Sequence, residues 1–335
     1  MKILYAIQGT GNGHASRALE IIPLLQQKAS VDILISGCQC DIELPFPITY
    51  KLHGLSFIFG QKGGIDLFQT VKKLKLVKLF REIQELPLKK YDLVINDFEP
   101  ISAWAAKLQN VPIISLSHQS AVLDNSSPTY KKYILERSIL KYYAPIKVRF
   151  GFHFKSYNSS IFTPIIRNQI RTINRTNKGH YTVYLPAYSD KKIVHLLSKF
   201  PVVKWHVFSK NSDKFHFKKN ITIQPINNFD FVKSMASCNG VLCGAGFETP
   251  AEALYLGKKL MVVPMKNQYE QQCNAIALKE LGVPVLKKLS IKRLKEIAHW
   301  IQSNETVKVS YPDITEEVLD AIISPHYTTE GLTTT

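Results

Sequence analysis

The sequence predicts an α/β protein built from two doubly wound, Rossmann-like halves that face each other across a cleft. Short apolar runs typical of buried parallel strands alternate with helical patterns along most of the chain. The length of 335 residues exceeds what one ordinary core needs and favours two domains. A glycine-rich loop joins a strand to a helix in each half, at 9–13 and at 244–246. Ligands of open parallel sheets bind at the carboxyl ends of the strands, so we expect the site in the cleft.

The order of strands and helices in the first half indicates a right-handed parallel sheet. Residues 2–7 form a short aliphatic run, and helical spacing follows the first glycine loop from Ala15 to Leu25. Residues 66–86 place apolar side chains near one helical face, with lysines opposite them. Further strands are predicted at 31–36, 91–97 and 111–117, and a further helix at 103–108.

The second half repeats this alternation after a polar, basic stretch at 167–180, which is the predicted linker. Strands are predicted at 181–187, 204–209, 220–225, 239–246 and 259–264, and helices at 191–200, 229–238, 248–257 and 271–282. We therefore expect an N-terminal Rossmann-like domain at 1–165, a C-terminal Rossmann-like domain at 166–311, and a C-terminal helix with a flexible tail at 312–335.

The composition is that of a folded protein with an excess of positive charge. Hydrophobic residues make up 45% of the chain and charged residues 21%, while 43 Lys and Arg against 26 Asp and Glu give a net charge of +17. The electrostatic field of such a net charge favours anionic partners. A surface of solvated lysines without such a partner would give the same net charge. No RNA- or DNA-binding motif accompanies the charge, so nucleic acid is not expected as a partner.

Cysteine usage and hydropathy argue for a cytoplasmic protein. The five cysteines are odd in number and lack CxxC spacing, which indicates neither a disulfide framework nor a zinc site. No apolar run reaches the ~18 residues of a membrane span, and no signal-peptide cleavage site is apparent. We expect a soluble or peripheral protein that uses no metal cofactor.

The first glycine loop, "GTGNGH" (9–14), does not fit the dinucleotide fingerprint, because its spacing is GxGxG instead of GxGxxG. Two interpretations remain. The loop can be a tight turn without a ligand, or its backbone can pass close to a substrate with His14 as the reactive group. The residues of this loop before His14 are Gly9, Thr10, Gly11, Asn12 and Gly13.

The second glycine loop precedes a well-marked helix start at Thr249 and Pro250. Backbone N–H groups at a helix N-terminus form an anion site that suits a diphosphate. Glu252 lies about one turn into this helix, where a carboxylate can accept hydrogen bonds from vicinal hydroxyls such as those of a ribose. Favourable interaction with the helix dipole alone is the alternative role for Glu252.

Four segments together resemble a known family: "GTGNGH" (9–14), "FTPIIR" (162–167), "GFETPAEAL" (246–254) and "VVPMKNQYEQQCNA" (262–275). The chain resembles the two-domain inverting glycosyltransferases of the GT-B fold, in particular glycosyltransferase family 28 and the UDP-glucuronosyltransferase-like enzymes. This resemblance implies transfer of a sugar from a nucleotide-diphosphate sugar, with UDP as the default nucleotide, to an acceptor hydroxyl. It also implies that the domain at 1–165 binds the acceptor and that the domain at 166–311 binds the nucleotide-sugar donor.

The resemblance also implies roles for residues of the second half. Glu252 would bind the donor ribose, and Glu270 and Gln271, ahead of Asn274, would bind hydroxyls of the transferred sugar. A solvated helix start is the alternative for this polar run. The loop implied to hold the donor diphosphate consists of Gly244, Ala245, Gly246, Phe247, Glu248 and Thr249.

By the same resemblance His14 removes the proton from the acceptor hydroxyl, oriented by Asp97 at the end of the strand at 91–97. A strand-end cap is the alternative role for Asp97. After the strand at 111–117, family 28 enzymes that act on lipid I have an acidic residue followed by Gln and Asn, whereas this chain has His118, Gln119 and Ser120. The departure leaves the acceptor open and makes His118 a rival to His14 as the base.

Other functions stay open beside the transferase. One alternative is a non-catalytic protein that binds a sugar nucleotide; another is a sugar-nucleotide 2-epimerase of the same fold, which would need several acidic residues in the cleft. The segments 72–90 and 131–155 mix Lys and Arg with apolar and aromatic residues, as would suit a peripheral enzyme on the inner face of a membrane with a lipid-linked acceptor. Two ordinary amphipathic helices with solvated lysines explain these segments equally well.

Overall fold

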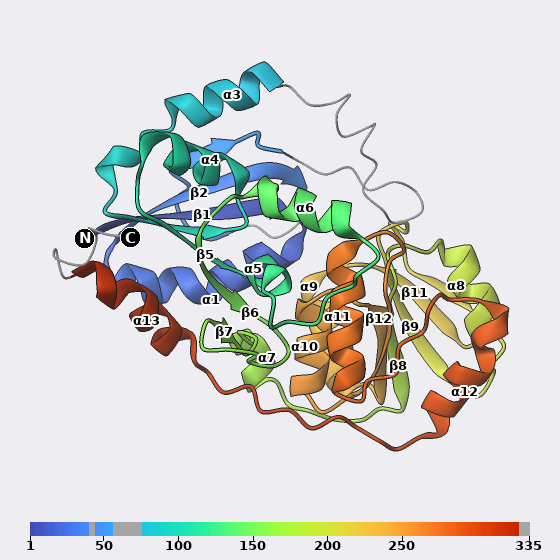
Figure 1. Cartoon of the computed structure of the whole chain (residues 1–335). Helices are drawn as coiled ribbons and strands as arrows, with labels where there is room; N and C mark the ends of the chain where they lie inside the picture. The colour runs from blue at the N-terminus through green and yellow to red at the C-terminus, as the bar shows by residue number, and fades with distance from the viewer. Residues whose placement is uncertain (40–43, 56–75, 328–335) are drawn as a thin grey trace.

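The computed structural model describes residues 1–39, 44–55 and 76–327, which form two parallel sheets flanked by helices (Figure 1). The first half contains β1 (Lys2–Thr10), α1 (Asn12–Lys28), β2 (Ser30–Gln39), β3 (Tyr50–Leu52), α3 (Leu76–Glu85), β4 (Leu93–Asp97), α4 (Pro100–Gln109), β5 (Ile113–Ser117), α5 (His118–Leu123), α6 (Ile134–Tyr143), β6 (Val148–Phe152), β7 (Ile161–Phe162) and α7 (Asn168–Thr172).

The sheet of the first half has the strand order β3-β2-β1-β4-β5-β6-β7, with every pair parallel. The order reverses direction between β1 and β4, which makes the carboxyl ends of these two strands the expected binding edge. The register places Ile7 of β1 opposite Asp97 of β4. The loop after β1 and the last residue of β4 are therefore neighbours.

The second half has a six-stranded sheet of order β10-β11-β9-β8-β12-β13, in which only the edge pair β10 and β11 is antiparallel. Its switch point lies between β8 and β12. The elements are β8 (His180–Tyr184), α8 (Asp190–Leu197), β9 (Lys204–Ser209), β10 (His216–Lys218), β11 (Ile221–Pro225), α9 (Asn228–Ser237), β12 (Gly240–Gly244), α10 (Glu248–Tyr255), β13 (Lys259–Val263), α11 (Tyr269–Glu280), α12 (Leu294–Gln302) and α13 (Thr315–Tyr327).

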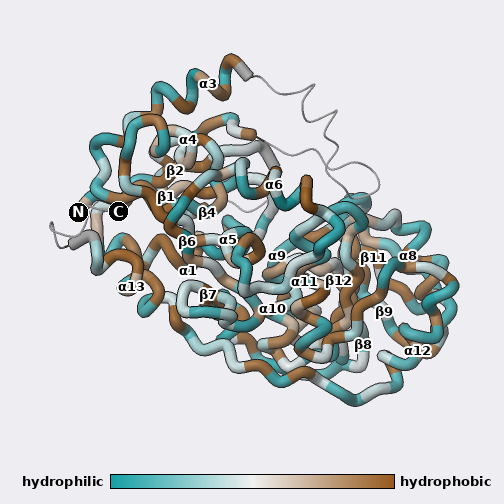
Figure 2. The backbone as a smooth tube through the Cα atoms, viewed as in Figure 1, coloured by the Kyte–Doolittle hydropathy of each residue, from teal (hydrophilic) through white to brown (hydrophobic). Residues whose placement is uncertain are grey.

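The central strands are the most buried part of each half, and much of the tube along them is brown in Figure 2. Tyr5 and Trp205 are among the largest side chains that are fully buried. Packing also crosses from one half to the other, because the rings of His118 and Phe247 stack with centroids 3.9 Å apart. Both halves thus form the walls of one site.

The C-terminal helix returns to the first half. In Figure 1, α13 (red) lies beside α1 (blue), and Lys28 of α1 is 2.6 Å from Asp320 and 3.3 Å from Glu316. The helix expected within 312–335 is thus α13, while residues 328–335 lie outside the described residues. The predicted domain boundaries stay a prediction.

The structure differs from the predicted elements in several places. The predicted linker 167–180 contains the short helix α7, and α1 begins at Asn12, three residues before the predicted start. Three elements between residues 118 and 162 were not predicted, namely α5, β6 and β7, because β6 and β7 are short and α5 spans only six residues. Helix α6 lies within the segment 131–155, for which an amphipathic helix was one of the two interpretations. The described part of the predicted helix at 66–86 is α3 except for its last residue, and residues 66–75 lie outside the described residues.

Candidate active site

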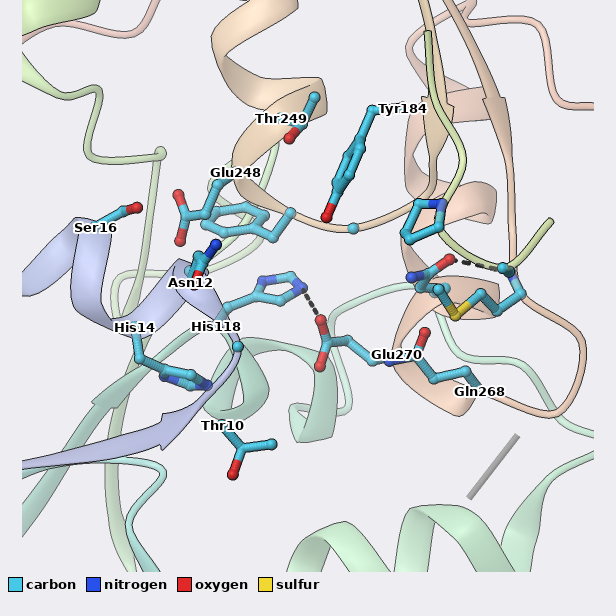
Figure 3. A pocket seen from close by; sticks show the side chains of 18 of the residues that line it. Thr10, Asn12, His14, Ser16, His118, Tyr184, Glu248, Thr249, Gln268 and Glu270 are labelled. Atoms are coloured by element: carbon cyan, nitrogen blue, oxygen red, sulfur yellow. Dashed lines mark hydrogen bonds and ion pairs between the residues drawn. The ribbon is translucent and has the colours of Figure 1, made fainter. Parts of the chain in front are cut away.

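A cleft of about 1520 Å³ lies between the two halves and is lined by residues from both. Figure 3 shows part of its wall, to which the first half contributes His14 and the second half Glu248. Most of the predicted site residues line this cleft. The exceptions are Gly9, Asp97, Gly244, Ala245 and Asn274.

Each of the three glycines of the first loop stands at its position for a different structural reason. A Cβ on Gly9 would stand 2.9 Å from a methyl group of Ile35, so Gly9 is required for packing against β2. Gly11 has a φ of 90°, a conformation that L side chains rarely adopt. A Cβ on Gly13 would lie 3.3 Å from the Glu248 side chain of the other half. Of the three, Gly13 therefore marks the close approach between the two halves, while Thr10, Gly11 and Asn12 line the cleft.

His14 stands in the first turn of α1 and is held by Asp97. Its Nδ1 lies 2.8 Å from Oδ1 of Asp97, a buried carboxylate at the end of β4. A neutral imidazole that donates its Nδ1 proton to this carboxylate keeps the lone pair on Nε2. The ring of Phe98, whose φ is 55°, lies parallel to that of His14 with centroids 6.4 Å apart. The pair therefore has the geometry of an oriented general base.

Asp97 does not cap the next helix. The N-cap of α4 is Glu99, whose side chain accepts hydrogen bonds from the backbone N–H groups of Ile101 and Ser102 at 2.7 and 2.6 Å. The carboxylate of Asp97 instead receives His14 and the guanidinium of Arg17. The alternative of a strand-end cap is therefore wrong for Asp97.

Arg17 is a site residue that the sequence analysis missed. It lies one turn after His14 on α1, is buried, and donates to both carboxylate oxygens of Asp97 at 2.8 to 3.1 Å. Its Nη1 donates to Oε1 of Glu248 at 2.6 Å, across the boundary between the halves. Burial alone would raise the pKa of Asp97, but Arg17 and His14 together lower it below its usual value. The spacing His14-x-x-Arg17, which puts both side chains on one helical face, was the available signal.

The second glycine loop meets the cleft with its last residues. Gly246, Phe247, Glu248 and Thr249 line it, and a Cβ on Gly246 would stand in open space. Gly244 ends β12, and Ala245 is buried behind this wall. Burial raises the pKa of Glu248 to about 7, although Arg17 opposes this shift. The first turn of α10 therefore presents to the cleft a carboxyl group whose pKa lies close to neutral pH.

Glu252 lines the cleft, but it is also engaged by a second arginine that the sequence analysis missed as a site residue. Arg167 forms a bidentate pair with it, Nε to Oε1 at 2.5 Å and Nη2 to Oε2 at 2.8 Å. Arg167 is the last residue of the "FTPIIR" segment, so the pair ties the connection between the halves to α10. Each carboxylate oxygen can accept a second hydrogen bond, so ribose hydroxyls remain compatible with this pair.

The polar run before and within α11 forms another wall. Glu270 lines the cleft and accepts a hydrogen bond from Gln119 of the first half at 3.0 Å. Gln271 also lines the cleft, and its Oε1 accepts from the backbone N–H of Met265 at 3.0 Å. Burial raises the pKa of Glu270, and the bond from Gln119 opposes this shift. This run is therefore not merely a solvated helix start.

His118 has a different position from His14. Its Nδ1 lies 2.8 Å from the carbonyl oxygen of Phe152, and its Nε2 lies 2.9 Å from Oδ1 of Asn274. Burial lowers the pKa of His118 to about 3, although the bond to Phe152 opposes this shift. The amide of Asn274 in turn donates to the carbonyl of Ala245 at 3.1 Å. Both ring nitrogens of His118 are thus engaged, Nδ1 with Phe152 of the same half and Nε2 with Asn274 of the second half.

Comparison with known proteins identifies the protein family to which this cleft belongs. The model of the glycosyl transferase family 1 matches residues 1–303. The chain belongs to glycosyl transferase family 1. Its members transfer sugars, so the chain is a glycosyltransferase.

Similar proteins agree with the fold of this glycosyltransferase. It is 23% identical over 336 residues to an uncharacterized glycosyltransferase of Methanosarcina mazei, covering 84% of each chain. The structure of MurG from Acinetobacter baumannii has a TM-score of 0.57 at 16% identity, covering 96% of this chain and 99% of that one. A UDP-N-acetylglucosamine 2-epimerase also has a TM-score of 0.57, at 12% identity, covering 100% and 99%. The GT-B fold expected from the sequence is confirmed.

The glycosyltransferase has a third wall that sequence reasoning did not identify. It comes from the carboxyl end of β8 and from the segments that follow β8, β9 and β11 in the second half, including the starts of α8 and α9. Its residues include Tyr184, Tyr188, Asp190, Lys210, Asn211, Ile226 and Phe231. These segments follow ordinary strands without a glycine-rich signature, so only the sheet topology brings them together.

The sequence analysis also made predictions about cysteines, metal sites and membrane spans, and the described residues bear on part of each. Cys238, Cys243 and Cys273 are buried free thiols, whereas the Cys38 side chain and all of Cys40 lie outside the described part. Residues 1–39, 44–55 and 76–327 contain no group of three or more His, Cys, Asp or Glu side chains that could hold a metal ion. None of the helices in these ranges combines the length and apolar character that crossing a membrane requires.

Proposed function

We propose that this glycosyltransferase takes its sugar from a nucleoside diphosphate sugar and transfers it with inversion to an acceptor hydroxyl that His14 deprotonates. The proposal depends above all on the hydrogen bond of 2.8 Å between His14 and Asp97, which lies across the cleft from the first turn of α10. UDP is the nucleotide that the family resemblance favours.

The donor is assigned to the second half. The N-terminus of α10 suits the diphosphate, because its N–H groups and dipole favour anions. Glu252, fixed by Arg167, is placed one turn further on to accept the ribose hydroxyls. Glu270 and Gln271 are assigned to the hydroxyls of the transferred sugar, with Asn274, Ala245 and Gly244 supporting that wall from behind.

The reaction follows from these assignments. Nε2 of His14 takes the proton from the acceptor hydroxyl as its oxygen bonds to the anomeric carbon. The bond from that carbon to the diphosphate oxygen breaks, and its electron pair leaves with the nucleoside diphosphate. Attack from the face opposite the leaving group inverts the anomeric centre. The partial positive charge at the start of α10 stabilises the departing diphosphate.

Several acidic side chains line the cleft. A sugar-nucleotide 2-epimerase was expected to need several of them, and Glu136, Asp190, Glu248, Glu252 and Glu270 all line the cleft. The number of carboxylates therefore gives no argument against a sugar-nucleotide 2-epimerase. What favours transfer is the family membership together with the His14 and Asp97 pair.

We further propose an acceptor borne on an anionic membrane at the cytoplasmic face, held close by α6. Ile134, Leu135 and Tyr142 of this helix are 75%, 64% and 62% exposed, beside Lys131, Lys132 and Lys141. The same helix contributes Glu136 and Leu140 to the cleft. In the other basic segment, Val77 and Phe80 of α3 are also exposed, and residues 72–75 lie outside the described residues.

A panel of nucleotide sugars tests the donor assignment. Incubation with UDP-, dTDP-, GDP- and ADP-sugars should give release of one nucleoside diphosphate, at a rate that rises when the correct acceptor is added. Proton NMR of the product should show an anomeric configuration opposite to that of the donor. Retention of configuration, or interconversion of the donor into its 2-epimer without release of nucleotide, contradicts the proposal.

A further inference from the structure

Arg17 joins the two halves, because it contacts Asp97 of the first half and Glu248 of the second. Arg17 holds Asp97 with Nε and Nη2, and its Nη1 donates to Glu248 at 2.6 Å. Asp97 in turn orients His14. The guanidinium of Arg17 thus contacts both Asp97, which orients the proposed base, and Glu248, the first residue of α10.

Glu248 is an unusual residue for its position. It opens α10, in the loop assigned to the donor diphosphate, and 21% of its side chain is exposed toward the cleft. Figure 3 shows it extending from α10 toward Asn12 and Ser16 of the first half. A carboxylate beside a diphosphate is repelled by it, unless its charge is neutralised or its counter-ion is shared.

We infer that Arg17 and Glu248 form an exchangeable ion pair: the donor diphosphate takes Nη1 of Arg17 from Glu248, so that Arg17 becomes a direct ligand of the leaving group. The inference rests on the proposed donor site. It adds a ligand from the first half to a diphosphate otherwise bound by the second.

The geometry of arginine suits this exchange. Its planar fork keeps the contacts of Nε and Nη2 with Asp97 while Nη1 changes its partner from a carboxylate to a phosphate oxygen. A lysine has one charged nitrogen and cannot hold both partners in this way. Donor binding would thus affect the pair of His14 and Asp97, because Arg17 contacts both Asp97 and the bound diphosphate.

The exchange also predicts proton uptake. The charged groups that face Glu248 are Arg17 and Asp97 from the first half, and Glu252 and Arg167 from the second. When Nη1 leaves Glu248 and a diphosphate approaches, this carboxylate loses a positive neighbour and gains a negative one. It then takes up a proton, which the variant Glu248→Gln cannot do.

Calorimetric titration with UDP, or with whichever of dTDP, GDP and ADP binds, tests the inference in two buffers of different ionisation enthalpy. We expect Glu248→Gln to bind UDP about fivefold more tightly than the wild type, with less proton uptake. Arg17→Lys should bind UDP about tenfold more weakly and also turn over more slowly. Glu316→Gln is the matched control, because Glu316 is a first-turn glutamate paired with a cation of α1, Lys28, away from the cleft.

The outcomes separate this inference from the proposed function. Equal affinity and equal proton uptake in the wild type and in Glu248→Gln, with UDP bound by both, overturn the exchange and leave the donor site intact. If no nucleoside diphosphate binds the wild-type protein, the donor site itself is wrong, and the exchange falls with it. Melting temperatures of all variants show whether a weaker affinity reflects partial unfolding.

Discussion

His14 and Asp97 are 83 residues apart in the sequence, yet Nδ1 of one lies 2.8 Å from Oδ1 of the other at the switch point of the first sheet. The adjacency of β1 and β4 produces this contact, because Ile7 is paired with Asp97 and the loop after β1 folds over the end of β4. The pair leaves Nε2 of His14 as the nitrogen that can take a proton.

Replacing His14 by Ala should lower kcat about 10²- to 10⁴-fold, the range of general-base contributions. Binding of the nucleoside diphosphate should change little, since the donor is assigned to the other half. Steady-state kinetics with calorimetry of UDP binding measures both quantities. Asp97→Asn should also lower kcat, and near wild-type turnover in His14→Ala would show that another group is the base.

Replacing Glu252 by Gln should weaken nucleoside diphosphate binding about tenfold, because a neutral amide accepts ribose hydroxyls less strongly and no longer balances Arg167. Glu252→Ala should be worse for stability, since it leaves the buried guanidinium of Arg167 unpaired. Binding is measured by calorimetry and unfolding by denaturant titration. Unchanged affinity in a folded Glu252→Gln variant would remove Glu252 from the donor site.

His118 should make the free energy of unfolding depend on pH. Its pKa is about 3 in the folded protein and near the ordinary 6.5 in the unfolded chain, so the unfolded state binds more protons between these values. The stability that this group contributes is present above pH 6.5 and is lost as the pH falls. Between pH 6.5 and pH 5 the loss should be about 2 kcal/mol.

Urea titrations of the wild type and His118→Gln at several pH values check this slope, which should be smaller in the variant. His299→Gln, which removes an exposed histidine of α12, controls for the loss of any histidine. Equal slopes in the wild type and His118→Gln would mean that His118 is not held neutral by burial.

The exposed residues of α6 should bind anionic vesicles. Leu135→Ser should reduce co-sedimentation with vesicles of phosphatidylglycerol and phosphatidylcholine severalfold, because it removes an apolar contact beside the lysines. Val202→Ser is the matched control, since Val202 is 94% exposed on the second half. Binding of the wild type should fall as salt rises. Equal partitioning to neutral and anionic vesicles would exclude this role for α6.

Much of the site could be predicted because it follows glycine-rich loops at strand ends. The loops at 9–14 and 244–249 are local patterns, and the sheet topology then brings them to one cleft. Arg17 and Arg167 could not be assigned in this way. The spacing His14-x-x-Arg17 puts Arg17 on the helical face of His14, but no local feature of either arginine says that it is buried against a carboxylate 80 or 85 residues away.

The sequence by itself determined the class of fold, the two halves and the position of His14, because hydrophobic periodicity and glycine loops are encoded over a few residues. Only the tertiary structure distinguishes the surroundings of His14 from those of His118. Both histidines follow a strand end, but His118 is packed between the halves with both ring nitrogens engaged, whereas His14 is held at one nitrogen beside the cleft. Burial and partner choice arise from contacts between distant segments, and no local pattern in the chain specifies them.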